Sequence, residues 1–173
     1  IQQKYSSFKI SVSHTTRKPR PNEVEGVDYF FVSHEEFKKK IKDNEFYEYA
    51  QIFDNFYGTS RESVNLLLKN NNNILFDIDW QGTQQLSSFK NLKLIKIYLI
   101  PPSKKELKKR LIKRNQDSPK DVERRFKAYD MDIKHWEDYD YVIINENLEN
   151  CYKQIENIIS VNKKKFVSIS QKF

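Results

Sequence analysis

The sequence is poor in the residues that define several large classes of protein. Its 173 residues contain one cysteine, Cys151, which excludes a disulfide framework and any cysteine-rich zinc site. The three histidines, His14, His34 and His135, are not spaced as metal ligands, and no apolar run approaches the roughly 20 residues that cross a bilayer. No signal peptide is visible either. We therefore expect a cytoplasmic protein that contacts no membrane.

Glycine is also scarce. The chain has only three glycines, Gly26, Gly58 and Gly82, and none is followed by Lys and then Ser or Thr. Loops that cradle phosphates need several glycines close together, so no such loop is written in these residues. The chain begins with Ile and enters an expected strand almost at once, which is typical of a chain that has been cut or lacks an upstream segment.

The charge is unbalanced toward basic residues. Thirty-one Lys and Arg against 24 Asp and Glu give a net charge of +7, which favours nucleotides or other polyanions as partners. Solubility and the lysine-rich composition that AT-rich coding produces account for the same charge. No recognised nucleic-acid-binding motif is present, so we expect no nucleic-acid partner.

The hydrophobic pattern alternates strands with helices. The strands are expected at residues 8–13, 27–32, 46–53, 74–78, 94–100 and 141–144. The helices are expected after Ser33, over residues 61–69, from Ser103, after Ser118 and over residues 148–163. Ser33 with Glu36 and Thr59 with Glu62 have the spacing of capping boxes. The last three strands are nearly continuous apolar runs, which predicts an α/β fold whose parallel strands are buried on both faces and whose ligands bind at the carboxyl ends of the strands.

A basic turn follows the first strand. Arg17 and Arg20 lie three residues apart among prolines that restrict the backbone. Two guanidinium forks suit a phosphate, because each can donate two charge-assisted hydrogen bonds to its oxygens. A solvated basic turn is the competing interpretation.

An aromatic-rich stretch carries Tyr29, Glu48, Tyr57 and Thr59. One carboxylate can accept hydrogen bonds from both N1–H and N2–H of guanine, and adenine offers no such pair of donors. A single Glu can therefore discriminate guanine from adenine. The competing interpretation is that the tyrosines are packing residues and that Glu48 is a surface charge.

Two acidic residues stand at the end of the apolar strand at 74–78. Asp77 and Asp79 are two residues apart, which would place both carboxylates on one face of a strand. Like charges so close repel unless a cation or donors meet them, so Mg²⁺ or a nucleotide is expected nearby.

Four arginines, Arg110, Arg114, Arg124 and Arg125, flank a polar turn between two expected helices. Arg110 and Arg114 are one helical turn apart and share a face. A hinged helix pair of this kind could close several guanidiniums over a transferring phosphoryl group. A basic helix surface is the competing interpretation.

With these residues in order, the chain resembles the guanylate kinase family, which passes the terminal phosphate of ATP to GMP. The resemblance runs from about Phe8 to Ile159. It rests on residues 11–21, 26–29, 45–50, 55–60, 77–82, 101–103 and 110–125. It implies a P-loop kinase-like parallel sheet core at residues 1–13, 74–108 and 126–173, an inserted mixed GMP-binding lobe at about 14–73, and a helical lid at about 109–125.

The resemblance also implies a role for each matching residue. The residues expected to bind GMP are Ser13, Arg17, Arg20, Tyr29, Glu48, Tyr57, Gly58, Thr59, Asp77 and Asp79. Among them, the phosphate is expected at Arg17, Arg20, Tyr29 and Tyr57, and the guanine at Ser13, Glu48, Thr59 and Asp79. The residues expected on the ATP side are Arg110, Arg114, Asn145 and Glu146. The residues expected to stabilise transfer are Arg20, Arg114 and Arg125. Asp77 is expected near Mg²⁺.

The sequence departs from the family pattern in places. The Gly-rich ATP loop expected before residue 8 has no counterpart here, so the chain as written is expected to transfer phosphate poorly. Asn115 stands where the family usually has Gly, Tyr49 where Trp is common, and Glu146 where Asp is common.

Two functions are compatible with the resemblance. One is a monomeric ATP:GMP phosphotransferase that uses Mg²⁺. The alternative is a non-catalytic guanylate-kinase-like module that binds GMP or a phosphopeptide. A binding module has no use for the arginine-rich lid or for the pair Asp77 and Asp79, and both features are present. We therefore expect the enzyme.

Overall fold

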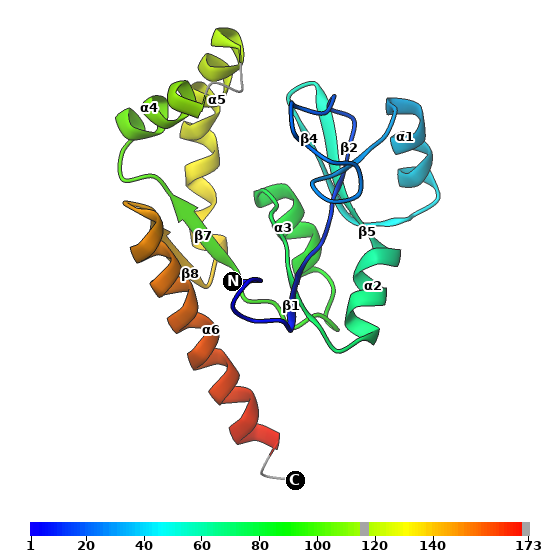
Figure 1. Ribbon diagram of the computed structural model, residues 1–173, viewed down its shortest axis with the longest axis vertical. Coiled ribbons are helices and arrows are strands. Elements are labelled where there is room, and N and C mark those ends of the chain that lie inside the picture. The colour runs from blue at the N-terminus through cyan, green and yellow to red at the C-terminus, as the bar shows by residue number, and fades with distance from the viewer. Residues whose placement is uncertain (115–117, 171–173) are drawn as a thin grey trace. The chain divides into compact units, whose positions relative to one another are not determined.

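The computed structural model describes the backbone of residues 1–114 and 118–170. The chain forms two compact units, which we call the N-terminal unit (residues 2–94) and the C-terminal unit (residues 95–173 with residue 1). In Figure 1 the N-terminal unit runs from blue to green and the C-terminal unit from green to red. Among the described residues, no helix is long and apolar enough to cross a membrane.

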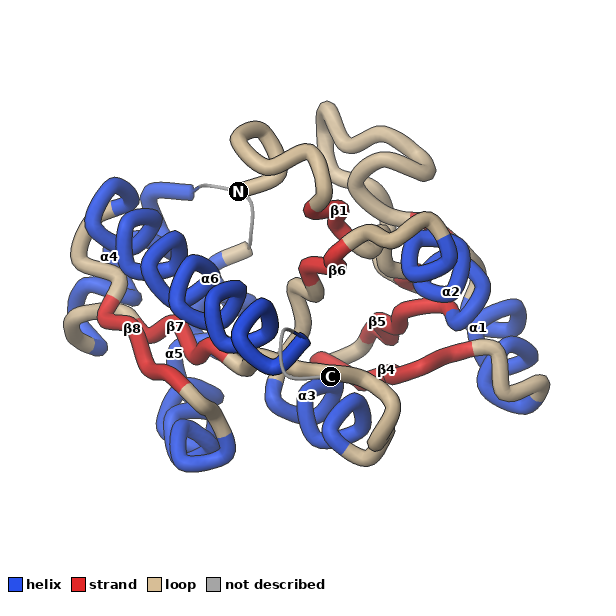
Figure 2. Tube along the Cα trace, turned by 90° about the horizontal axis from the view of Figure 1, so that it is seen from below, coloured by secondary structure: helices blue, strands red, loops and turns tan. Residues whose placement is uncertain are grey.

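The N-terminal unit contains two sheets. The strands of the larger sheet lie in the order β3 (Phe30–Phe31), β2 (His14–Thr15), β5 (Asn55–Ser60), β4 (Phe46–Ile52). β2 is parallel to β3 and antiparallel to β5, and β5 is antiparallel to β4. The smaller sheet is a parallel pair, β1 (Phe8–Ile10) with β6 (Asn73–Leu75). Figure 2 shows β4 and β5 running side by side.

Three helices complete this unit, namely α1 (His34–Lys42), α2 (Arg61–Lys69) and α3 (Trp80–Ser87). The capping box predicted for α1 is confirmed, because Ser33 Oγ accepts the Glu36 N–H at 3.1 Å and Glu36 Oε2 accepts the Ser33 N–H at 2.7 Å. Phe37 of α1 is fully buried, with its ring centroid 4.6 Å from that of Phe46 and 5.4 Å from that of Phe56. The cap therefore starts a helix that covers one face of the larger sheet.

The start of α2 differs from the prediction. Its bounds are as predicted, but its cap is Ser60, whose Oγ accepts the Ser63 N–H at 3.3 Å. The predicted capping box of Thr59 with Glu62 is wrong, because Thr59 is still inside strand β5 and its hydroxyl lies 3.3 Å from Ser13 Oγ.

The segment after β6 also differs from the prediction. The strand predicted over residues 74–78 ends at Leu75, so Asp77 and Asp79 do not share a strand face. Asp79 instead caps α3, a helix that the hydrophobic pattern did not indicate. The reason is local: a carboxylate that accepts the first free backbone N–H groups starts a helix at that residue.

The main core of the N-terminal unit joins α2, α3 and β4. Tyr47, Val64 and Leu86 are buried together, with two phenylalanines and four aliphatic residues packed around them. The Tyr47 hydroxyl donates to Asn65 Oδ1 at 2.7 Å, so the one polar atom of this aromatic side chain is satisfied. This core holds α3 against β4, which matters for the site described below.

The C-terminal unit has one parallel pair of strands, β7 (Ile97–Ile100) and β8 (Tyr141–Ile144). Its helices are α4 (Lys104–Arg114), α5 (Pro119–Asp132), the 3₁₀ helix η1 (Ile133–Asp138) and α6 (Leu148–Ser170). The predicted caps are confirmed, because the hydroxyls of Ser103 and Ser118 accept the N–H groups of Glu106 and Asp121 at 3.1 and 3.2 Å. α6 begins at the predicted residue and runs past the predicted end at 163.

The parallel pairing predicted for the apolar strands is confirmed in both units. The predicted burial on both faces is wrong, because no residue of β6 or β7 is buried and Ile143 is the one buried residue of β8. Ile143 is 2% exposed, but its neighbours Val142 and Ile144 are 39% and 51% exposed. Strand β8 thus alternates between buried and exposed side chains, as a strand with one packed face does.

Candidate nucleotide-binding site

Strands β4 and β5 bring together three of the residues predicted to bind guanine. Glu48 on β4 is paired with Thr59 on β5. The Thr59 hydroxyl lies 3.3 Å from Ser13 Oγ, just before β2. Thr59 is fully buried and Glu48 is only 3% exposed. A carboxylate is therefore held inside the unit among hydroxyl groups, and the interpretation of Glu48 as a surface charge is wrong.

The surroundings of Glu48 change its protonation. Burial raises the pKa of the Glu48 carboxyl to about 7, and the nearby Asp79 carboxylate adds to the rise. Hydrogen bonds from Thr59 act in the opposite direction and lower this pKa. A ligand that presents N–H donors to Glu48 would favour the ionised form and lower its pKa again.

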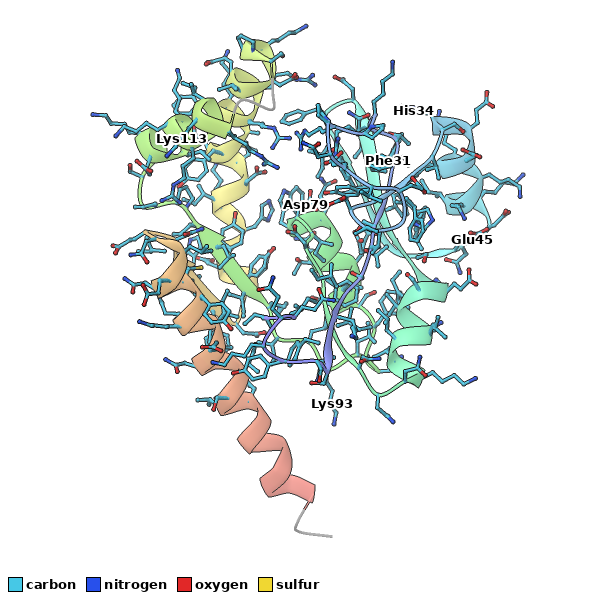
Figure 3. All side chains as sticks on the ribbon, in the orientation of Figure 1. Phe31, His34, Glu45, Asp79, Lys93 and Lys113 are labelled. Atoms are coloured by element: carbon cyan, nitrogen blue, oxygen red, sulfur yellow. The ribbon has the colours of Figure 1, made fainter. Side chains whose placement is uncertain are left out.

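The fourth predicted guanine-binding residue, Asp79, begins helix α3, where Figure 3 labels it. Its Oδ1 accepts the Gly82 N–H at 3.1 Å, and its Oδ2 accepts Nε2 of Gln81 at 2.9 Å. The Thr83 hydroxyl donates to the Asp79 carbonyl at 2.9 Å. The cap thus fixes the direction of the Asp79 carboxylate, and its charge acts on Glu48.

Three residues predicted to bind phosphate also meet in the N-terminal unit. The guanidinium carbon of Arg17 lies 5.3 Å from the ring centroid of Tyr29, and the rings of Tyr29 and Tyr57 are 6.1 Å apart. The side chain of Tyr57 contributes to raising the pKa of Arg17, so these two groups also lie near each other. Burial raises the pKa of Tyr29, and the charge of Asp77 contributes, which places the Asp77 carboxylate near this cluster.

Glu23, which no motif in the sequence indicated, is the acidic partner of this cluster. Glu23 accepts a bidentate pair of hydrogen bonds from Arg17, at 3.0 and 2.8 Å, and its Oε2 also accepts the Arg20 backbone N–H at 2.6 Å. The hydrogen bonds from Arg17 lower the pKa of the Glu23 carboxyl. The one available indication was an acid three residues after Arg20 in the same turn.

For two other predicted GMP-binding residues, Arg20 and Gly58, the structure shows contacts within the protein. The backbone N–H of Arg20 belongs to the Glu23 turn, and the role of its guanidinium stays a prediction. Gly58 is buried where a Cβ would come within 3.0 Å of the Phe37 ring and 3.1 Å of the Glu48 carbonyl oxygen. This glycine lets α1 and β4 approach β5 closely, and a direct contact with a ligand stays a prediction.

In the C-terminal unit, Arg110 reaches the loop after β8. Its guanidinium donates to the carbonyl oxygens of Asn145 at 2.8 Å and Glu146 at 2.9 Å, and its Nε donates to Glu106 Oε1 at 3.1 Å. Three residues predicted on the ATP side therefore lie together. These donors of Arg110 form hydrogen bonds within the protein, so the contacts in the structure show Arg110 holding the loop in place.

The remaining lid arginines are on the two helices that flank the turn. Arg114 is exposed near the end of α4, and Arg125 is half-buried on α5. Asn115 lies outside the described residues. The roles of Arg114 and Arg125 stay predictions.

A site for Mg²⁺ would depend on few protein ligands. Among the described residues, no three His, Cys, Asp or Glu side chains gather as metal ligands do. Mg²⁺ bound to nucleotides commonly takes only one or two carboxylates and completes its shell with phosphate oxygens and water. The exposed carboxylate of Asp77 fits that requirement.

Comparison with known proteins shows which family the chain matches. The family model for guanylate kinase matches residues 1–162. The guanylate kinase of Zymomonas mobilis is 46% identical over 154 residues, which are 89% of this chain and 71% of that protein. The guanylate kinase of Clostridioides difficile is 43% identical over 159 residues, covering 92% of this chain and 77% of that protein.

A solved structure agrees with these matches. The crystal structure of guanylate kinase from Anaplasma phagocytophilum matches with a TM-score of 0.77 at 35% identity, covering 91% of this chain and 77% of that chain. The chain belongs to the guanylate kinase family. The resemblance and the α/β fold class predicted from the sequence are thus confirmed.

Proposed function

We propose that this protein transfers the terminal phosphoryl group of ATP to GMP, giving ADP and GDP. The observation that carries the proposal is the buried carboxylate of Glu48, held beside Asp79 in the same unit as the Arg17, Tyr29 and Tyr57 cluster. A purine with two adjacent N–H donors satisfies the first group, and a phosphate satisfies the second. Guanosine monophosphate has both.

The spacing of the two groups supports a single nucleotide. Tyr57 and Thr59 are two residues apart on β5, so their side chains lie on one face of the sheet, about 7 Å apart along the strand. Tyr57 belongs to the proposed phosphate end and Thr59 to the proposed guanine end. A bound GMP would lie along this face, with its base toward Glu48 and its phosphate toward Arg17.

The chemistry would consist of positioning and electrostatic stabilisation. In-line phosphoryl transfer needs little covalent help from the protein, so no side chain has to act as a nucleophile. Arg20, Arg114 and Arg125 would stabilise the charge on the transferring group, and Arg110 would hold the loop at Asn145 and Glu146 on the ATP side. Mg²⁺, with Asp77 as its protein ligand, would neutralise phosphate charge when bound.

The first prediction concerns substrate choice. The protein is expected to bind GMP at least about tenfold more tightly than AMP, because AMP lacks the donor pair that Glu48 accepts. Isothermal calorimetry with each nucleotide measures the ratio. The reaction is measured by incubating the full-length protein with ATP and GMP and detecting the GDP formed by chromatography. Equal affinities would contradict the guanine assignment, and GMP binding without GDP formation would favour a binding module.

The second prediction concerns Glu23. Glu23→Gln is expected to weaken GMP binding by about tenfold, because an amide cannot accept both hydrogen bonds that orient the Arg17 guanidinium. Guanosine, which has no phosphate, should bind the variant as it binds the parent protein. Glu25→Gln is the matched control, since it removes the same charge nearby from a residue that accepts the Phe31 N–H. Tighter GMP binding by Glu23→Gln would show that Glu23 competes with phosphate rather than positioning Arg17.

A further inference from the structure

Helix α3 approaches strand β4 most closely at Gly82. A Cβ placed on Gly82 would come closer to Glu48 Oε2 than real Cβ atoms approach other heavy atoms, and it would lie 3.1 Å from Glu48 Cδ. The backbone of Gly82 is in a conformation open to any L-residue, since its φ is not in the left-handed region. Glycine is a poor helix former, so its presence in α3 is explained by the space that Glu48 occupies.

A second residue of α3 joins the same strand one turn further on. Gln85 Oε1 accepts the Tyr49 N–H at 3.1 Å, and Gln85 Nε2 donates to the Tyr49 carbonyl at 2.7 Å. The side-chain amide thus satisfies both backbone groups of the residue that follows Glu48. Residues 82 and 85 are three apart and share one face of the helix. That face lies on β4.

We infer that Gly82 and Gln85 are positioning residues that set the gap between α3 and β4, and thereby hold the carboxylates of Glu48 and Asp79 side by side to read guanine. The inference rests on the proposed function. Glu48 is fixed to the strand, and Asp79 is fixed to the start of the helix by the Gly82 N–H and Gln81. The relative position of the two carboxylates therefore depends on how helix and strand meet.

The consequence for specificity is geometric. A side chain at position 82 must displace the Glu48 carboxylate or push α3 away from β4. Either movement changes where Glu48 and Asp79 lie relative to the two N–H donors of guanine. The phosphate cluster of Arg17, Tyr29 and Tyr57 is built from the turn after β2, the segment before β3 and strand β5, and not from α3, so phosphate binding should persist.

The test compares Gly82→Ala and Gln85→Ala with Gln84→Ala, an exposed glutamine on the same helix. Gly82→Ala is expected to weaken GMP binding by about 100-fold and Gln85→Ala by about tenfold, with AMP binding nearly unchanged. Gln84→Ala should bind GMP as the parent protein does. In a Glu48→Ala background, Gly82→Ala should cause no further loss of GMP affinity and should recover the melting temperature that it loses alone.

A second readout does not depend on GMP. The parent protein should change in stability with pH as Glu48 titrates in its buried position, and Gly82→Ala should lose that change because the carboxylate is driven toward water. A folded Gly82→Ala variant that keeps both the GMP preference and the pH response overturns the inference. Equal losses for GMP and AMP also overturn it. A parent protein that keeps the pH response but shows no GMP preference overturns the proposed function instead.

Discussion

Replacing Glu48 with Gln should weaken GMP binding by about 100-fold or more while leaving AMP binding within about threefold of the parent protein. Glutamine has nearly the same shape as glutamate, so the fold of β4 is retained. Its amide offers one acceptor and one donor group, and a donor facing the two N–H groups of guanine leaves hydrogen bonds unmade in a buried site. Calorimetry with GMP and AMP on both proteins measures the change.

Glu45→Gln is the control for this substitution. Glu45 lies at the start of the same stretch, forms an ion pair with Lys40 at 2.7 Å, and is far more exposed than Glu48. Its replacement should leave the ratio of GMP to AMP affinity unchanged. A Glu48→Gln protein that binds GMP as well as the parent does would exclude Glu48 as the residue that reads guanine.

The same substitution should make the unliganded protein more stable above pH 7. The pKa of Glu48 is about 7 in the folded protein against an ordinary value of 4.5, so the folded state holds a proton that the unfolded state has released. Stability from this group is fully present below pH 4.5 and is lost as the pH rises through about 7. The loss amounts to at most about 3 kcal/mol in the free energy of unfolding.

Urea unfolding between pH 4.5 and pH 8 measures this effect as the difference between the parent and Glu48→Gln. The difference should grow with pH and level off above about 7, because glutamine carries no titrating group. Glu45→Gln should bring no gain, since its ion pair with Lys40 lowers the pKa of Glu45 and gives the opposite sign. Parallel pH curves for the parent and Glu48→Gln would mean that the Glu48 carboxyl titrates normally.

The affinity for guanosine should increase with pH, whereas the stability that Glu48 contributes decreases. Guanine donors favour the ionised carboxylate, so guanosine binding is expected to strengthen as the pH rises toward about 7. Guanosine is the proper probe because it has no phosphate. The phosphate of GMP titrates at about pH 6 and would add its own pH dependence. Loss of this dependence in Glu48→Gln would assign it to Glu48.

Much of the site could be named from the sequence. Ser13, Glu48 and Thr59 come together as predicted, and so do Arg17, Tyr29 and Tyr57. These residues were found as members of ordered motifs and not from contacts. Each motif identifies its site residues by their type and spacing. The family resemblance then assigns motifs that lie far apart in the sequence to one site, which no local pattern can do.

Other features could not be predicted from the sequence, because they depend on single residues that belong to no recognisable pattern. Glu23 is one acid among many until the turn brings it to Arg17. The apolar run before Asp77 indicates a longer strand than the structure has, because hydrophobicity alone does not distinguish a strand from the buried segment that leads into a helix. The resemblance predicts Arg110 on the ATP side, and its contacts with two backbone carbonyls appear only in the folded unit.

The sequence alone determined the caps at Ser33, Ser103 and Ser118, each of which depends on residues three positions apart. It also determined the parallel pairing of the apolar strands and the family, through patterns that extend along most of the chain. The tertiary structure alone decided the state of Glu48. Its burial, its raised pKa and the space left by Gly82 arise from segments more than 30 residues apart, which meet only when α3 packs on β4. Desolvation acts through three-dimensional surroundings, and the order of residues along a chain does not specify them.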